Sequence, residues 1–212
     1  IHAERIPMAW EYRVETSTGN VYFVAAYNGA GYLNPGMLQA PLPVSGLPYA
    51  PQYCTNHCLP HYRKWGLTVS GFVIDGFGRS IDQNGLEAYA SFSPNGMVRQ
   101  DVESYAWLFP DGLEPHPVPL TQWHHNMPIL REGGHVNEDP VADAATVVKM
   151  ANEYPIPFFW VRNILKSPTW YVTIVEEMKR LDRDIELVDA PTFFELYRIY
   201  LNEKKNTNNV IK

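Results

Sequence analysis

The sequence has few cysteines and no long hydrophobic run, and each absence excludes a class of protein. Only Cys54 and Cys58 are cysteines among 212 residues, so the chain is not a small fold held together by several disulfide bridges. The longest apolar stretch, 156–165, is interrupted by proline, arginine and asparagine. It is shorter than the roughly 20 apolar residues that cross a bilayer, and we therefore predict no membrane span.

Positive charge is also scarce. Lysine and arginine together number 17 against 23 aspartate and glutamate residues, and the formal net charge is -6 at pH 7 with neutral histidines. The basic residues form no run longer than two. Since nucleic-acid binding requires a surface that neutralises phosphates, we expect no nucleic-acid partner.

Several sequence motifs of enzymes are missing as well. The chain contains no G-x-S-x-G, H-E-x-x-H or P-loop pattern, which argues against a serine hydrolase, a zincin and an NTPase. The glycine loop at 28–32 lacks the third glycine and the following helix of a dinucleotide fingerprint. No cofactor is expected.

What is present is a composition typical of a globular protein. Apolar residues make up 45% of the chain and aromatic residues 13%, and a chain of this length can bury roughly 70% of its unfolded surface. We predict a single α/β domain over 1–203 and a flexible polar tail over 204–212. The eighteen prolines and the many aromatic residues suit surface loops whose flat faces stack on sugar rings or pack within the loops.

Short apolar runs alternate with helical patterns along the chain. We predict strands at 21–26, 67–75, 88–92, 126–130, 157–161 and 185–188. An imperfect helix is expected at 52–64, where Pro60 should kink or end it, and helices are expected to begin at 139–140, 167–168 and 190–191. Because parallel neighbours need crossovers of this kind, the fold class is α/β, with a mostly parallel sheet or a partial (β/α) barrel and helices packed outside.

Ligands of parallel α/β folds bind at the carboxyl ends of the strands, where polar groups converge. Two carboxylates there, Asp75 and Glu132, are our candidate pair for glycoside cleavage, one acting as general acid and the other as base or nucleophile. Asp189 is the reserve carboxylate. Arg131 or Arg162 could hold a carboxylate ionised or bind an acidic sugar. The alternatives are a structural Asp–Arg network for Asp75 and a helix cap for Asp189.

A cluster of soft ligands occurs at 54–61, where cysteine and histidine alternate as C-x-x-H-C-x-x-H. On a helix the two cysteines share one face and the two histidines share another, so packing is favoured over zinc binding or a disulfide bridge, which both stay open. His124, His125 and His135 have no partner at ligand spacing. We therefore predict no metal.

The segment VYFVAAYNGAGYLNP at 21–35 resembles the hallmark of the GxGYxYP family, whose members are classed as glycoside hydrolases. Gly29, Gly31, Tyr32 and Pro35 match, whereas Asn34 stands in place of the second tyrosine. Segments 70–75, 89–96, 158–170 and 188–196 are similar to the carboxyl-terminal domain of the family, so the likeness extends over nearly the whole chain. It implies a barrel-like α/β domain for sugar processing in an extracellular or secreted protein.

Two functions follow from these observations. The first is a glycoside hydrolase that uses Asp75 and Glu132, with a glycan as its partner. The alternative is a lectin that binds a glycan through an aromatic and polar rim. The expected substrate-binding residues are Asn28, Gly29, Gly31, Tyr32, Asn34, Arg131, His135, Arg162 and Asp189.

The resemblance also bears on assembly, because members of the family are longer at the amino terminus. The chain is therefore expected to be the carboxyl-terminal part of a longer precursor. Such a piece would leave strand edges open, and open edges pair with other chains. We expect either a homo-oligomer or association with another chain of a cleaved precursor.

Overall fold

The computed structural model describes residues 7–18, 22–25, 31, 33–39, 49–76, 78–100 and 116–210. Its helices are α2 (Pro7–Thr16), the short 3-10 helix η1 (Pro35–Leu38), α3 (Pro51–Trp65), α4 (Gln83–Phe92), α5 (Pro140–Glu153), α6 (Pro168–Leu181) and α7 (Ala190–Val210). Its strands are β1 (Val69–Val73), β2 (Gly96–Arg99), β3 (Thr121–His124), β4 (Met127–Arg131), β5 (Gly134–His135) and β6 (Val161–Arg162). Within this part of the chain, no helix is both long and apolar enough to span a bilayer.

The main sheet has four strands in the order β1-β2-β4-β3. The pairs β1–β2 and β2–β4 are parallel, and β3 joins β4 as an antiparallel hairpin through a turn at 125–126. β5 and β6 form a separate two-stranded parallel sheet. The prediction of an α/β fold with a mostly parallel sheet is confirmed, and the described strands form open sheets rather than a closed barrel.

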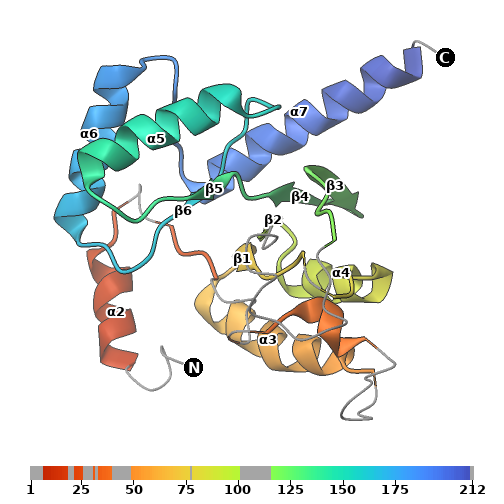
Figure 1. The fold of residues 1–212 in the computed structure, drawn as a ribbon. Helices are drawn as coiled ribbons and strands as arrows, with labels where there is room; N and C mark the ends of the chain where they lie inside the picture. The colour runs from red at the N-terminus through yellow and green to blue at the C-terminus, as the bar shows by residue number, and fades with distance from the viewer. Residues whose placement is uncertain are drawn as a thin grey trace.

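Helices cover both faces of the main sheet (Figure 1). One face packs against α3 and α4 in a cluster that contains Tyr62, Tyr89, Met97 and Ile129. The opposite face, with Val69, Val98 and Leu130, packs against Phe193, Phe194 and Tyr197 of α7. Aromatic rings fill this second layer because small strand residues leave room for them. At Gly96, for example, an added Cβ would lie 2.4 Å from the Phe194 ring.

A third apolar cluster lies between α5 and α6. It contains Val136, Ala144, Val147, Trp170, Ile174 and Met178. The two helices begin where side chains cap them: the carboxylate of Asp139 accepts from the backbone N–H groups of Val141 and Ala142, and the Ser167 hydroxyl accepts from that of Trp170. A proline follows each cap, where its missing N–H costs nothing. The predicted starts of both helices are confirmed.

Other elements differ from the prediction. Residues 88–92 belong to α4 rather than to a strand, and its start is capped by Asp82, whose carboxylate accepts from the Gly85 N–H at 2.7 Å. The strand predicted at 157–161 is reduced to β6, and 185–188 forms no strand. Within 21–26, Ala25 forms an isolated bridge to Ser70. α3 continues through Pro60 to Trp65, and α7 continues to Val210, where the sequence predicts a polar tail.

Candidate functional site

Asp75 lies at the carboxyl edge of the main sheet, just after β1, and is completely buried. Arg99, the last residue of β2, donates to its carboxylate and forms an ion pair with it. The other carboxylate oxygen lies 2.9 Å from Nε2 of His116 and accepts from the Gly76 N–H at 2.9 Å. Arg99 also donates to the side chain of Gln122 in β3 at 2.6 Å. Asp75 is thus held by an arginine, as the structural alternative for this residue anticipates.

Glu132 follows β4 at the same edge of the sheet and is also buried, with 7% of its surface exposed. Its Oε1 lies 3.6 Å from Nη2 of Arg162. The guanidinium of Arg162 in turn lies 4.5 Å from the centroid of the Phe72 ring. His135 pairs with Arg162 in the β5–β6 sheet. The structure therefore brings three predicted site residues together: Glu132, Arg162 and His135.

The two candidate carboxylates point to opposite faces of the sheet. Side chains alternate between faces along a strand. Val73 and Met97 belong to the cluster on the α3–α4 side, so Asp75 and Arg99, two residues further on, lie on that side. Leu130 belongs to the α7 cluster, which places Glu132 on the α7 side. Asp75 and Glu132 therefore do not face one another across a shared cleft.

Two other predicted residues cap helices. The carboxylate of Asp189 accepts from the Thr192 N–H at 2.9 Å and from the Thr192 hydroxyl at 2.7 Å, at the start of α7. These two hydrogen bonds hold the pKa of Asp189 below its usual range, and the bond from the backbone N–H has the larger effect. Asn34 caps η1 by accepting from the Gly36 N–H at 3.0 Å. Both side chains are used for local structure.

The remaining predicted residues are more widely placed. Nη1 of Arg131 donates to the Val118 carbonyl at 3.3 Å. Gly31 has φ +101°, a conformation that glycine adopts without steric cost. Asn28, Gly29 and Tyr32 lie outside the described residues.

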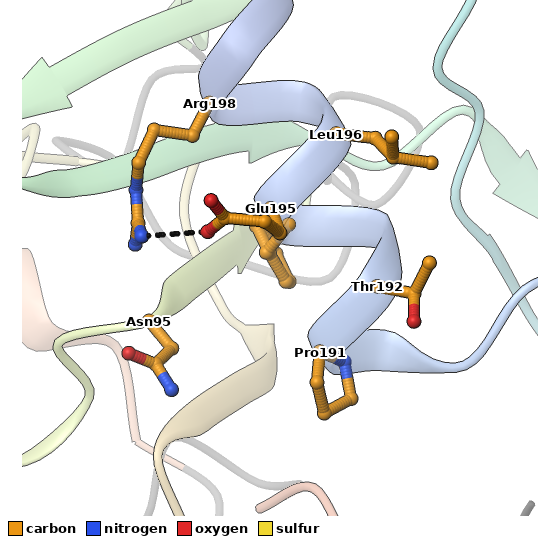
Figure 2. A pocket seen from close by; sticks show the side chains of 7 residues that line it. Asn95, Pro191, Thr192, Glu195, Leu196 and Arg198 are labelled. Carbon is orange, nitrogen blue, oxygen red and sulfur yellow. Dashed lines mark hydrogen bonds and ion pairs between the residues drawn. The ribbon is translucent and has the colours of Figure 1, made fainter.

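A pocket of about 390 Å³ lies at the opposite, amino-terminal edge of the sheet. Figure 2 shows Asn95, which precedes β2, facing the first turns of α7. Glu195 and Arg198 of α7 form an ion pair with an O–N distance of 3.0 Å. Thr192 and Pro191 complete this side of the pocket. Phe194 and Leu196 line it as well, so the lining is largely apolar and carries a few polar groups, with both signs of charge.

A second pocket of about 290 Å³ adjoins the first. Both are lined by Pro191. The amide of Asn95 in the first pocket donates to the hydroxyl of Thr68 in the second at 3.0 Å. Aromatic side chains line the second pocket: Tyr22, Phe23 and Trp65. We refer to the two pockets together as the amino-edge groove. The sequence predicts a ligand site at the carboxyl edge of the sheet and not at this groove. The groove could not be predicted because residues of α7 meet Asn95 only in the folded chain.

Glu87, His124 and His125 form a cluster that could hold a metal ion. The sequence shows no ligand partner for the two histidines, since Glu87 is 37 residues earlier in the chain. Hydrogen bonds from His124 and His125 keep the pKa of Glu87 below its usual range. In the described part of the chain, this cluster is a set of possible metal ligands that the sequence does not predict.

Cys54 and Cys58 are free, buried thiols in the α3–α4 core. Their sulfur atoms lie 3.9 Å apart. The hydrogen bond to Cys54, together with burial, raises the pKa of Cys58 well above its usual range. This thiol therefore stays protonated and packs as a small apolar side chain.

Comparison of the chain with family models, curated proteins and solved structures finds no significant match.

Proposed function

We propose that this chain is a carbohydrate-binding domain and that the amino-edge groove is its glycan site. The observation that carries the proposal is an aromatic pocket that adjoins a second pocket where a few polar side chains lie among apolar ones. A pyranose ring has an apolar C–H face that stacks on an aromatic ring, and its hydroxyls need hydrogen-bond partners. The rings of Tyr22 and Trp65 offer a stacking surface. The hydrogen-bond partners for the hydroxyls are Asn95, Thr192 and Glu195. This mixture of apolar and polar lining is usual for ligand sites.

The arrangement of carboxylates favours binding over hydrolysis. Glycoside cleavage needs two carboxyl groups about 5–10 Å apart on the two sides of one bond. Asp75 and Glu132 instead pair with separate arginines, on opposite faces of the sheet. Among the described residues that line the groove, one is a carboxylate, Glu195. A lectin needs no acid and base pair.

The test is a glycan-array scan of the wild type and of variants in the groove. Tyr22 is 48% exposed, so Tyr22→Ala removes a stacking surface with little effect on the core. The matched control is Tyr53→Ala, because Tyr53 is also an exposed tyrosine, 61% exposed, at the far end of α3. We expect the wild type and the control to bind the same glycans. Tyr22→Ala and Asn95→Ala should bind them at least about tenfold more weakly, since loss of one good contact is worth about 1.4 kcal/mol or more.

Three results would refute the lectin proposal. The first is glycan binding that neither groove variant weakens, and the second is no binding at all. The third is release of sugar from the bound glycans that is lost in Glu132→Gln, or in Asp75→Asn, while far-UV circular dichroism shows that the variant is still folded. That third result would instead support the hydrolase.

The proposal extends to location and assembly. The resemblance to the GxGYxYP family supports an extracellular or secreted protein. Ala25 bridges to β1 at one end of the main sheet, whereas β3 forms the other end of the sheet in the described part of the chain. An edge such as that of β3 supports a homo-oligomer or a partner chain from a cleaved precursor.

A further inference from the structure

We propose that Glu87, His124 and His125 form a binding site for a divalent transition-metal ion of the zinc type, with an open coordination position toward solvent. One carboxylate oxygen of Glu87 lies 2.9 Å from Nε2 of His124 and 2.7 Å from Nε2 of His125. The three candidate ligand atoms all lie within 4.8 Å of one another. The site is separate from the groove and does not rest on the glycan proposal.

The hairpin β3–β4 places the two histidines. His124 ends β3 opposite Met127, and because directly opposite residues share a face, it points to the α4 side with that buried methionine. His125 begins the turn with φ +51°, a left-handed conformation that is uncommon for a residue other than glycine. The two rings are in contact, with centroids 4.5 Å apart. A positive φ is what a two-residue hairpin turn requires at its first central residue, and this turn places the two neighbouring histidines beside one carboxylate.

The helix α4 supplies the third group and leaves space for solvent. The Glu87 side chain is 62% exposed and that of His125 is 67% exposed, whereas His124 is 9% exposed. His124 is therefore a fixed anchor, and the other two side chains can adjust around an ion. Zinc takes ligands at about 2.0–2.2 Å in tetrahedral geometry, and small rotations of the exposed side chains would place the ion between the three atoms.

The donor set determines which ion fits. Two imidazoles and one carboxylate with water in a fourth position is a known arrangement for zinc that keeps an open site. Imidazole nitrogen favours zinc, copper, nickel and iron over magnesium or calcium. We therefore expect zinc to bind and magnesium not to compete with it.

The experiment titrates the full chain with Zn²⁺ against a chromophoric chelator, at neutral pH with excess Mg²⁺. The ligand variants are Glu87→Gln and His125→Ala, both at exposed positions that leave the core intact. The matched control is His57→Ala, because His57 and His61 form another pair of neighbouring rings, with centroids 5.2 Å apart. Far-UV circular dichroism checks that every variant is folded. Substitution with Co²⁺ reports whether sulfur takes part, through its thiolate charge-transfer band.

We expect one equivalent of Zn²⁺ to bind the wild type and the control equally. Each ligand variant should bind about tenfold or more weakly, because loss even of a residue behind a ligand costs about 10–100-fold. The Co²⁺ spectrum should lack the thiolate band. Any of four results would overturn the assignment. The wild type could fail to bind Zn²⁺, both ligand variants could still bind it, His57→Ala could lose binding, or the Co²⁺ spectrum could show a thiolate band. The first of these results would leave the three residues as a hydrogen-bonded cluster.

Discussion

Asp75 is the residue whose local role is clearest from its contacts. Its carboxylate is fully buried and pairs with Arg99, which is 2% exposed. Asp75→Asn would leave the guanidinium buried without its counter-charge, so we expect a loss of about 3–5 kcal/mol in the free energy of unfolding. Urea denaturation followed by circular dichroism measures it. Glu177→Gln, which removes an exposed pair with Arg180 on α6, should cost less than about 1 kcal/mol. Equal losses in both variants would contradict this interpretation of Asp75.

Asp189 gives a prediction about pH. Its pKa is lowered in the folded chain, first by the backbone N–H of Thr192 and then by the Thr192 hydroxyl. A depressed carboxyl pKa contributes stability above the unfolded value of about 3.9, and this contribution is lost as the pH falls through the folded value. Thr192→Val removes the hydroxyl and keeps the N–H, so the pKa of Asp189 should rise part of the way toward its usual value in an NMR titration.

Asp182 is the control for that titration. Its pKa is lowered by hydrogen bonds from Asn152 and from the Asp184 backbone, neither of which involves Thr192. Thr192→Val should leave it unchanged. An unchanged Asp189, or equal movement of both residues, would contradict the cap.

Some candidate residues could be assigned from sequence, and others could not. The cap at Asp189 is predictable because aspartate followed by Ala-Pro-Thr is a local signal for a helix start. The separation of Asp75 from Glu132 is not predictable, since it depends on which face of the sheet each side chain takes. The cluster of Glu87 with the two histidines is also hidden in the sequence, because α4 and β3 meet only through tertiary packing.

The contact between α7 and β2 limits the side chain at position 96. A Cβ there would lie 2.4 Å from the Phe194 ring, and overpacking of this kind typically costs about 1–3 kcal/mol. We expect Gly96→Ala to destabilise the chain by that amount in urea. Combining it with Phe194→Leu should cost less than the sum of the two single changes, because the smaller side chain yields room.

Gly66 is the contrasting glycine. It ends α3 with φ +63°, and nothing lies within 4 Å of an added Cβ. Gly66→Asn should be well tolerated, since asparagine adopts this conformation, whereas Gly96→Asn should be at least as destabilising as Gly96→Ala. If asparagine were equally tolerated at both positions, packing against α7 would not explain Gly96.

The errors in the predicted elements have a physical cause. A short apolar run such as 88–92 fits a buried strand or a buried helical turn equally well, and here the cap at Asp82 decides for the helix. β2 escapes prediction because it has four residues and ends in the charged Arg99, which is buried through its pairing with Asp75. The sequence does predict β1 and β4, because their apolar runs are longer. The first run ends before Gly76 and the second before the charged Arg131.

The edge of the main sheet at β3 bears on the assembly of the whole molecule. From the proposed oligomer or precursor complex we expect light scattering on purified chain to give a mass above the 24.2 kDa of one copy, or a stable complex with a partner fragment when the two are co-expressed. The mass should fall on dilution if copies of the chain pair with one another. A monodisperse single copy that binds no partner would contradict both forms of the assembly.

The division of the core into three clusters has a consequence for how the molecule opens. The cluster between α5 and α6 shares no buried residue with the other two. Two hydrogen bonds join the segment between α5 and α6 to the residues at the end of β4. The Gly133 N–H donates to the Trp160 carbonyl at 2.8 Å, and the Tyr154 hydroxyl donates to the Arg131 carbonyl at 2.7 Å. We therefore expect α5 and α6 to open together while the β1-β2-β4 core stays closed, with Phe158 and Trp160 of the connecting segment still packed on the α7 cluster. In native-state hydrogen exchange, amides of α5 and α6 should exchange together at a lower free energy than those of β2 and β4, which exchange only when the whole chain unfolds.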